Sequence, residues 1–309
     1  MQSRQSTTIN IACSIAIAAT SVGCSGVTPS SSEYGIAGAS HLPGSVDVEG
    51  STNHASQVGD TTDAASGAQV GGETSGDDAS VTASAGQELT GRPSIGSLSV
   101  GRNSLTFKSM YSNSTQLDSG QFTTVTGGTL LAVVGMGSLA NLHAPRDNRG
   151  NTFRALLPAH NYVNWSGSGQ QLYAATQIAG GKGHVVTETM PDVNDEVTLS
   201  VIEIRGARRI SGASVAEQAN YGPVKSAKVT TTGPAILVAW WWGDGAIVQT
   251  SATTSAGWSR IHSLTRAQAE TGVVQTELAA KAVAAAGTYS ITWRSDHDQG
   301  AVVYLVAVE

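Results

Sequence analysis

The sequence predicts an all-β protein made of short strands, and three observations support this fold class. Glycine is frequent, with 36 copies in 309 residues, and charged residues make up only 13% of the chain. From about residue 93 onward, short apolar runs alternate with turns rich in Gly, Asn and Asp, as in β-sandwich proteins. A ten-residue stretch, 126–135, also returns about a hundred residues later as 232–241. We therefore expect a repeated β-structure.

The candidate strands of the first repeat follow one another at intervals typical of an all-β sandwich. One later stretch, 266–286, is rich enough in alanine to suggest a helix. Its counterpart in the first copy, 172–181, ends in two glycines and favours a strand, so we expect strands in both. The expected strands of the first repeat are 104–111, 120–126, 129–136, 151–156, 171–178, 184–189 and 196–204.

The repeat extends beyond the first matching stretch. Three further blocks match in the same order with a nearly constant offset, and each copy ends in an apolar strand. The matching blocks are 148–153 with 254–258, 183–187 with 287–291, 192–195 with 296–299, and the closing strands 197–204 with 301–308. We interpret the part of the chain after residue 92 as a degenerate duplication.

Two arrangements of this duplication are open. The first is two tandem β-sandwich units, immunoglobulin-like or jelly-roll-like, covering 93–210 and 211–309. The alternative is one larger β-sandwich with pseudo-twofold symmetry and a shared core. Strand 129–136 is apolar on both of its sides, whereas a strand with one face in water alternates apolar and polar residues. This pattern favours close contact between the copies.

Charge is distributed unevenly along the chain. The net charge is −6, and residues 25–92 contain nine acidic side chains against the single base Arg92. From residue 93 onward, fourteen acids stand against fifteen bases, a difference of +1. Neither part resembles a phosphate-binding surface, so we expect no nucleic-acid partner. The only cysteines are Cys13 and Cys24, so no disulfide stabilises residues 93–309.

The N-terminal residues 1–23 have the features of an export signal. Arg4 supplies the positive charge, and residues 9–22 form an apolar stretch that is too short to span a bilayer permanently. Secretion is therefore expected.

Residues 21–24, with the sequence SVGC, resemble the lipobox of bacterial lipoproteins. This resemblance implies cleavage before Cys24 and diacylation of its thiol, although Ser21 stands where the family usually has leucine. Ser25 is the residue type that in this family accompanies transfer to the outer membrane. The expected location is thus the outer membrane or cell surface, through lipidated Cys24. A soluble secreted protein is the alternative.

Residues 24–92 are expected to form a flexible, acidic tether. The segment is rich in Gly, Ser, Thr and Ala, and Tyr34 is its only aromatic residue. Such a composition buries too little apolar surface to offset the entropy of ordering. As a flexible coil it would have an end-to-end distance of about 40–50 Å. It would hold a folded region away from a membrane.

A second resemblance concerns the first copy. Residues 147–153, an Asp-x-x-Gly-Asn-x-aromatic turn, and 202–206, the end of a closing strand with Glu203, resemble β-sandwich modules common in bacterial secreted proteins of unassigned function. The resemblance covers residues 104–207. It implies an extracellular β-sandwich and no particular activity, because this fold hosts many functions.

Few residues point to catalysis. The sequence has no Gly-x-Ser-x-Gly elbow, no His-Glu-x-x-His and no phosphate loop. Glu188 and Glu203, on strands expected to be neighbours, are a candidate acid pair of the glycosidase type. His143 and His160 are expected to be surface residues. We therefore predict no enzyme, with a glycoside-active enzyme as the weakest alternative.

One cluster of oxygen ligands is a weak calcium candidate. Asp192, Asn194 and Asp195 lie together before a strand, and Ca²⁺ favours such ligands. The same residue types also dominate β-turns, because they bond their own backbone. The spacing of a complete calcium loop is missing. We therefore favour a turn, and no other cofactor is expected.

The tryptophans are the remaining signal. In a strand, Trp240 and Trp242 point to one side and Trp241 to the other, so at least one is expected near an edge. Exposed Trp240, Trp242 and Trp258 would stack on sugar rings. The alternative is that these rings fill the core or the contact between the copies.

The sequence therefore predicts a lipid-anchored, surface-displayed protein with a binding role. The binding partner would be a glycan, recognised weakly through the three tryptophans named above, or a cell-surface protein. The alternative is a structural or assembly subunit of a surface layer or appendage.

Overall fold

The computed structural model describes residues 80–83, 91–109, 112–163, 165–191, 196–219, 222–244, 252–268, 272–295 and 300–309. The described residues form antiparallel strands and one short 3₁₀ helix, η1 (Leu139–Asn141), so the predicted all-β class is confirmed. None of their helices is long and apolar enough to cross a membrane. The described residues all belong to one compact unit. The expected signal, Cys24 and the calcium candidates Asp192, Asn194 and Asp195 lie outside the described residues.

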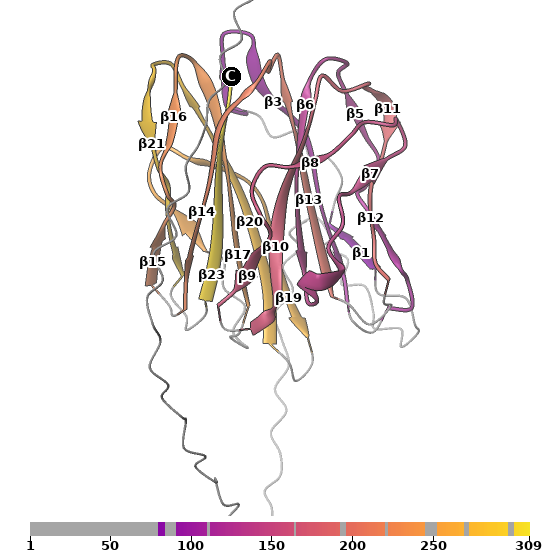
Figure 1. The fold of residues 1–309 in the computed structure, drawn as a ribbon. Coiled ribbons are helices and arrows are strands. Elements are labelled where there is room, and N and C mark those ends of the chain that lie inside the picture. Colours follow the sequence, from indigo (N-terminus) through magenta and orange to yellow (C-terminus); the bar gives the residue numbers. More distant parts are fainter. Residues whose placement is uncertain are drawn as a thin grey trace, which may run out of the picture. The chain divides into compact units, whose positions relative to one another are not determined.

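The first half of the folded region runs from β1 to β13 (Figure 1). Its strands are β1 (Ser80–Ala83), β2 (Ser94–Ile95), β3 (Leu98–Lys108), β4 (Gln116–Asp118), β5 (Phe122–Thr124), β6 (Thr129–Met136), β7 (Arg146–Asp147), β8 (Arg154–Ala155), β9 (His160–Tyr162), β10 (Trp165–Thr176), β11 (Gly181–His184), β12 (Val186–Thr189) and β13 (Val197–Arg205).

The second half runs from β14 to β23. Its strands are β14 (Ile210–Gln218), β15 (Gly222–Lys225), β16 (Val229–Thr231), β17 (Ala235–Asp244), β18 (Thr253–Thr254), β19 (Ser259–Gln268), β20 (Gly272–Val283), β21 (Gly287–Tyr289), β22 (Thr292–Ser295) and β23 (Gly300–Val308). The alanine-rich stretch is thus part of two long strands, β19 and β20, as its counterpart in the first copy indicated.

The two halves have the same strand order. The large sheet of the first half has the order β3-β13-β6-β10-β8, and that of the second has β14-β23-β17-β20-β19. Each half also has a three-stranded sheet, β4-β12-β7 or β15-β22-β18, and a two-stranded sheet, β5-β11 or β16-β21. The topology therefore repeats strand by strand.

The opening strand of the repeat lies inside its sheet in both halves. β6 has the bounds predicted from sequence, and all eight of its residues are buried. It pairs with β13 on one side and β10 on the other, as β17 pairs with β23 and β20. Strands apolar on both sides need cover on both sheet faces. Both faces of β6 and β17 are in fact covered.

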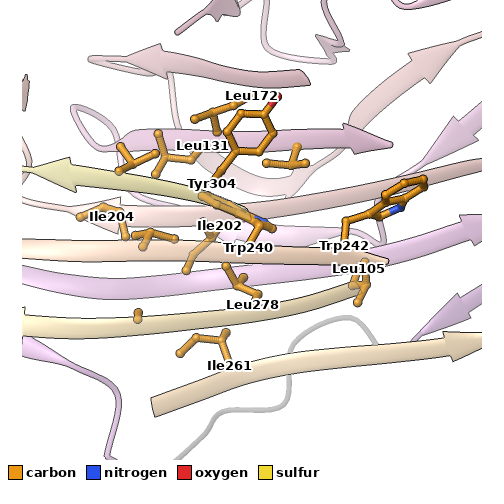
Figure 2. Close-up of a cluster of buried hydrophobic side chains, with 14 of the residues drawn as sticks. Leu105, Leu131, Leu172, Ile202, Ile204, Trp240, Trp242, Ile261, Leu278 and Tyr304 are labelled. Atoms are coloured by element: carbon orange, nitrogen blue, oxygen red, sulfur yellow. The ribbon is translucent and has the colours of Figure 1, made fainter. Parts of the chain in front are cut away.

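Three buried clusters supply that cover. The first core contains first-half residues such as Leu130, Val134, Tyr173 and Leu199. The second core contains second-half residues such as Leu237, Trp241, Trp293 and Leu305. The shared core draws on both halves and lies between the two large sheets. Its larger side chains include Phe107. Figure 2 shows Leu105, Leu131, Leu172, Ile202, Ile204, Trp240, Trp242, Ile261, Leu278 and Tyr304 of the same cluster.

The expected tether needs one correction. Ser80–Ala83 lies inside the segment 24–92, yet it pairs as β1 with Leu105 to Lys108 of β3. β2 pairs with Ser99 and Leu98, at the other end of the same strand. An edge strand offers unpaired backbone N–H and C=O groups, which any extended segment can satisfy. β1 and β2 therefore close the outer edge of β3.

Candidate functional site

The predicted tryptophan site lies in the shared core. Trp240 is 0% exposed and Trp242 is 3% exposed, and both side chains point from β17 toward the first half (Figure 2). Trp241 points the opposite way into the second core and is also fully buried. The expectation that one of the three lies near a surface is corrected. Neither Trp240 nor Trp242 presents a ring face to a sugar.

Their burial follows from the position of β17. The strand lies between β23 and β20, with the shared core on one face and the second core on the other. Alternation along the strand sends each indole into one of these cores. A buried indole supplies a large apolar area, which accords with the alternative that these rings form the contact between copies.

Polar groups inside the shared core connect the two large sheets. The indole Nε1 of Trp240 donates a hydrogen bond to Ser200 Oγ of β13, at 2.8 Å. Ser200 Oγ lies 3.1 Å from His262 Nε2, and His262 Nδ1 lies 3.0 Å from Asn103 Oδ1. Because an amide oxygen only accepts, Nδ1 carries the proton and Nε2 accepts from Ser200. The chain of bonds crosses between the sheets three times.

His262 is held in its neutral form by this environment. Burial lowers its pKa to about 3, because a charged imidazolium loses hydration there. The unfolded chain would protonate this ring near pH 6.5. The neutral histidine therefore stabilises the fold above that pH, and the contribution is lost as the pH falls from 6.5 toward 3. Since the ring is only half-buried, solvent weakens the effect.

Trp242 is accommodated by a glycine in the opposite sheet. A Cβ atom on Gly135 of β6 would lie 2.7 Å from Trp242 Nε1 and 2.6 Å from Thr198 Oγ1. Tyr162 of β9 meets the same indole edge to face, with ring centres 5.2 Å apart. Gly135 and Trp242 lie on the corresponding central strands of the two halves. The contact thus needs a small residue on one side and a large one on the other.

Further hydrogen bonds join the halves across the shared core. Tyr304 Oη donates to the backbone oxygen of Gln170 at 2.9 Å, and Gln170 Nε2 donates to the backbone oxygen of Val302 at 3.1 Å. At the rim, His160 Nε2 lies 2.8 Å from the carboxylate of Glu217. These bonds specify the register between the large sheets.

Trp258 is the predicted site residue that keeps some exposure. It is half-buried, as is Tyr289, and both pack against the second core. Gly257 precedes it in a left-handed turn with φ of 83°, and a Cβ there would lie 3.2 Å from Lys281 Nζ. Trp258 therefore remains available for a surface contact.

The turn that carried the module resemblance is closed by a buried polar network. Asp147 accepts from the backbone of Arg149 and Asn151, from Asn151 Nδ2 and from His184 Nε2 at 2.8 Å. His184 Nδ1 lies 2.7 Å from Thr124 Oγ1. Burial alone would raise the pKa of Asp147, but the bonds from Asn151 and His184 outweigh it and lower the pKa. The network ties β5, β7 and β11 together.

Glu188 is a buried carboxyl group whose polar contact is a poorly aligned one with the backbone of His143. Its side chain is 0% exposed, and neither carboxyl oxygen makes a bond of regular geometry. Burial raises its pKa to about 8, and the backbone of His143 offsets only part of this. The charge of Glu188 in turn helps burial to raise the pKa of Tyr173. At neutral pH the group is mostly protonated.

Glu188 and Glu203 were expected to lie on neighbouring strands, and this prediction is wrong. β12, which carries Glu188, pairs with β4 and β7, whereas β13, which carries Glu203, pairs with β3 and β6. The Glu203 carboxylate accepts from the backbone N–H groups of Val125 and Arg102 and from Arg205 Nε. Through the bond from Val125, this carboxylate stabilises the turn before β6. The two carboxylates therefore do not form an acid pair.

Glu309 has the corresponding role in the second half. Its carboxylate accepts from the backbone N–H and the hydroxyl of Thr232, in the turn before β17, and from Arg209. Burial would raise the pKa of Glu309, but the bonds from Thr232 and Arg209 lower it. A carboxylate thus anchors the same turn in both copies.

No metal centre occurs among the described residues, where no three His, Cys, Asp or Glu side chains gather closely enough to hold an ion. His143 Nδ1 bonds the backbone oxygen of Asn141 in its own loop, and His160 bonds Glu217. The two histidines thus have separate partners.

A comparison of the chain with protein-family models, curated proteins and solved structures finds no match. The functional reading therefore depends on the residues and their geometry.

Sequence reasoning missed the residues that complete the shared core. Ser200, His262 and Asn103 carry no motif, and they meet only when the two large sheets pack together. Gly135 was visible as a glycine in an apolar strand, a signal for close approach of another group. The partner that approaches it was not predictable from spacing.

Proposed function

We propose that this protein is a lipid-anchored, surface-displayed structural subunit that assembles with other copies on the cell surface. The acidic tether holds the folded region away from the outer membrane, to which acylated Cys24 attaches it. The observation that carries the structural role is the burial of Trp240 and Trp242 in the shared core. The residues best suited to ligand stacking instead join the two halves.

The arrangement of the two halves is part of the same proposal. Each half would be a β-sandwich unit with its own core, and the two units would be fused back to back through the shared core. Support comes from the repeated strand order and from the hydrogen bonds that cross between the large sheets. Such a body would resist separation of its halves.

Two measurements test this proposal. Mass spectrometry of the exported protein should find an acylated Cys24 at the mature N-terminus, and an unmodified cysteine would contradict the anchor. Light scattering of the purified chain should show a mass that rises with protein concentration. A single-copy mass at every concentration would contradict assembly.

A second candidate function is weak glycan recognition at Trp258. The half-buried indole and the nearby Lys281 favour it, since sugars bind by stacking and by hydrogen bonds to hydroxyls. A polysaccharide pull-down with Trp258→Ala tests it, with Val125→Ala, at a side chain that is 48% exposed, as the control. Equal retention of parent and Trp258→Ala would exclude this site.

A further inference from the structure

The two large sheets differ at one edge. On the first sheet, β1 and β2 pair with the outer side of β3. The equivalent strand of the second sheet is β14, which pairs only with β23 among the described residues. Every residue of β14 except Ser214 is partly or fully exposed. Residues 210–217 thus form an edge whose outer side pairs with no other described strand, and such an edge is a template for another strand.

The surroundings of β14 indicate the chemistry of the missing strand. On the side of the shared core, Ile210, Ala213 and Val215 form a partly buried apolar row. On the other side, Ser214 Oγ donates to the backbone oxygen of Ala227, which places that segment beside β14. Lys225 and Lys228 lie on either side of Ala227 in the sequence. Both are exposed, and neither forms an ion pair with another described residue. The strand that fits is apolar on one face and acidic on the other.

The chain itself contains one segment with this pattern. Residues 45–49 read SVDVE, so that valines alternate with Asp47 and Glu49. In an extended strand, Val46 and Val48 share one face and the two carboxylates the opposite face. The valines would extend the apolar row of β14, and the carboxylates would meet the two lysines.

We propose that residues 45–49 of a second copy add to the outer edge of β14 as an extra strand. This proposal rests on the assembly function above and names the contact that carries it. Backbone hydrogen bonds give such strand addition its affinity, and alternate side chains give it specificity. Because each copy offers one segment and one edge, the contact is head to tail and builds open chains or rings.

The test uses the full chain purified in detergent, with its mass measured over a range of concentrations. Val46→Pro with Val48→Pro removes two backbone donors from the segment, and we expect loss of the concentration-dependent species. Val58→Pro with Val70→Pro, at isolated valines of the same tether, is the matched control and should assemble like the parent. Circular dichroism checks that all variants keep the β-structure.

A charge exchange tests the partner face. Asp47→Lys with Glu49→Lys should weaken assembly, and adding Lys225→Glu with Lys228→Glu should restore it. A zero-length cross-linker applied to a mixture of ¹⁴N- and ¹⁵N-labelled chains should join Asp47 or Glu49 of one copy to Lys225 or Lys228 of another.

The outcomes separate this contact from the assembly function. If the parent assembles and the Val46→Pro, Val48→Pro variant assembles equally well, the contact is overturned while assembly stands. If the parent has a single-copy mass at all concentrations, both are overturned. Cross-links found only within one isotopic copy also overturn the contact between copies.

Discussion

The two halves of the folded region share a strand order but differ in how their corners and cores are built. In the first half, the Asp147 turn is closed by buried hydrogen bonds to Asn151, His184 and Thr124. In the second half, Tyr289 and Trp258 are half-buried, and the tyrosine hydroxyl bonds only the backbone of Ala285 among the described residues. One topology is therefore stabilised by polar bonds in one copy and by aromatic area in the other.

This difference shows which features the shared topology requires. Both copies keep a central strand that is apolar on both faces, and both keep a carboxylate that anchors the turn before it. The corners and the separate cores of the two copies differ in their residues. A large side chain of the shared core, such as Trp240, should therefore matter more to stability than a half-buried corner side chain such as Trp258.

Trp240→Ala should have the largest effect, because it empties the shared core and removes the donor to Ser200. We expect a loss of about 3–5 kcal/mol in the free energy of unfolding. Trp258→Ala, at a half-buried ring, should cost about 1 kcal/mol or less. Urea denaturation of both variants measures the difference. Equal losses would show that the shared core is no more important than the corner.

Asp147→Ala should come next, because it leaves several donors of the first-half corner without their acceptor. We expect a loss of about 2–4 kcal/mol. Thr254→Ala, at the equivalent place in β18, should change stability by about 0.5 kcal/mol or less. Hydrogen exchange at residues 147–151 should rise in the first variant only. Unchanged exchange there would mean that the network does not hold the turn.

Glu188→Gln should stabilise the protein in a pH-dependent way. The folded state keeps this carboxyl neutral up to about pH 8, whereas the unfolded chain ionises near pH 4.5. The parent therefore loses stability as the pH rises from 4.5 to 8, and the glutamine variant is spared this loss. We expect a gain of about 2–4 kcal/mol near pH 8 and almost none near pH 4.

Denaturant midpoints between pH 4 and pH 8 measure this gain. Glu33→Gln, in the acidic segment 24–92, is the control and should follow the parent at every pH. A difference between Glu188→Gln and the parent that stays constant with pH would contradict the buried neutral carboxyl.

Gly135→Ala should have the smallest effect of the four. The new methyl group would press on Trp242 and Thr198, and overpacking of this kind costs about 1–2 kcal/mol. Gly167→Ala is a suitable control, because a Cβ at Gly167 meets nothing within 4 Å. Thermal unfolding of the two variants should differ by a few degrees. Identical midpoints would mean that the sheets adjust around the contact.

The predictions from sequence succeeded where the signal was local. Strand 129–136 was placed with its observed bounds, because an apolar run bounded by a Gly-Gly turn needs no information from elsewhere. The strands in the alanine-rich stretch were also placed correctly, since comparison with the first copy outweighed the helix preference of alanine. The start of β3 at Leu98 was missed because Gly101, Arg102 and Asn103 weaken its pattern.

The predicted tryptophan site was wrong because the packing of the two halves could not be predicted from the sequence. Alternation placed Trp240 and Trp242 together on one side of a strand, and that side is where the structure has them. Whether the side faced water or another sheet depended on how the two halves meet. The prediction that Glu188 and Glu203 lie on neighbouring strands was wrong for a similar reason. Their strands, β12 and β13, follow each other in the chain but belong to different sheets.

The sequence alone determined the fold class, the repeat, the central strands and the side of the strand on which each indole lies, because these follow from composition and from periods of two residues. Tertiary structure alone decided that the two large sheets face each other. That packing buries Trp240 and Trp242 and sets Gly135 against an indole. Among the described residues, β3 is paired on both sides and β14 on one. These outcomes depend on contacts between residues far apart in the chain, which no local pattern encodes.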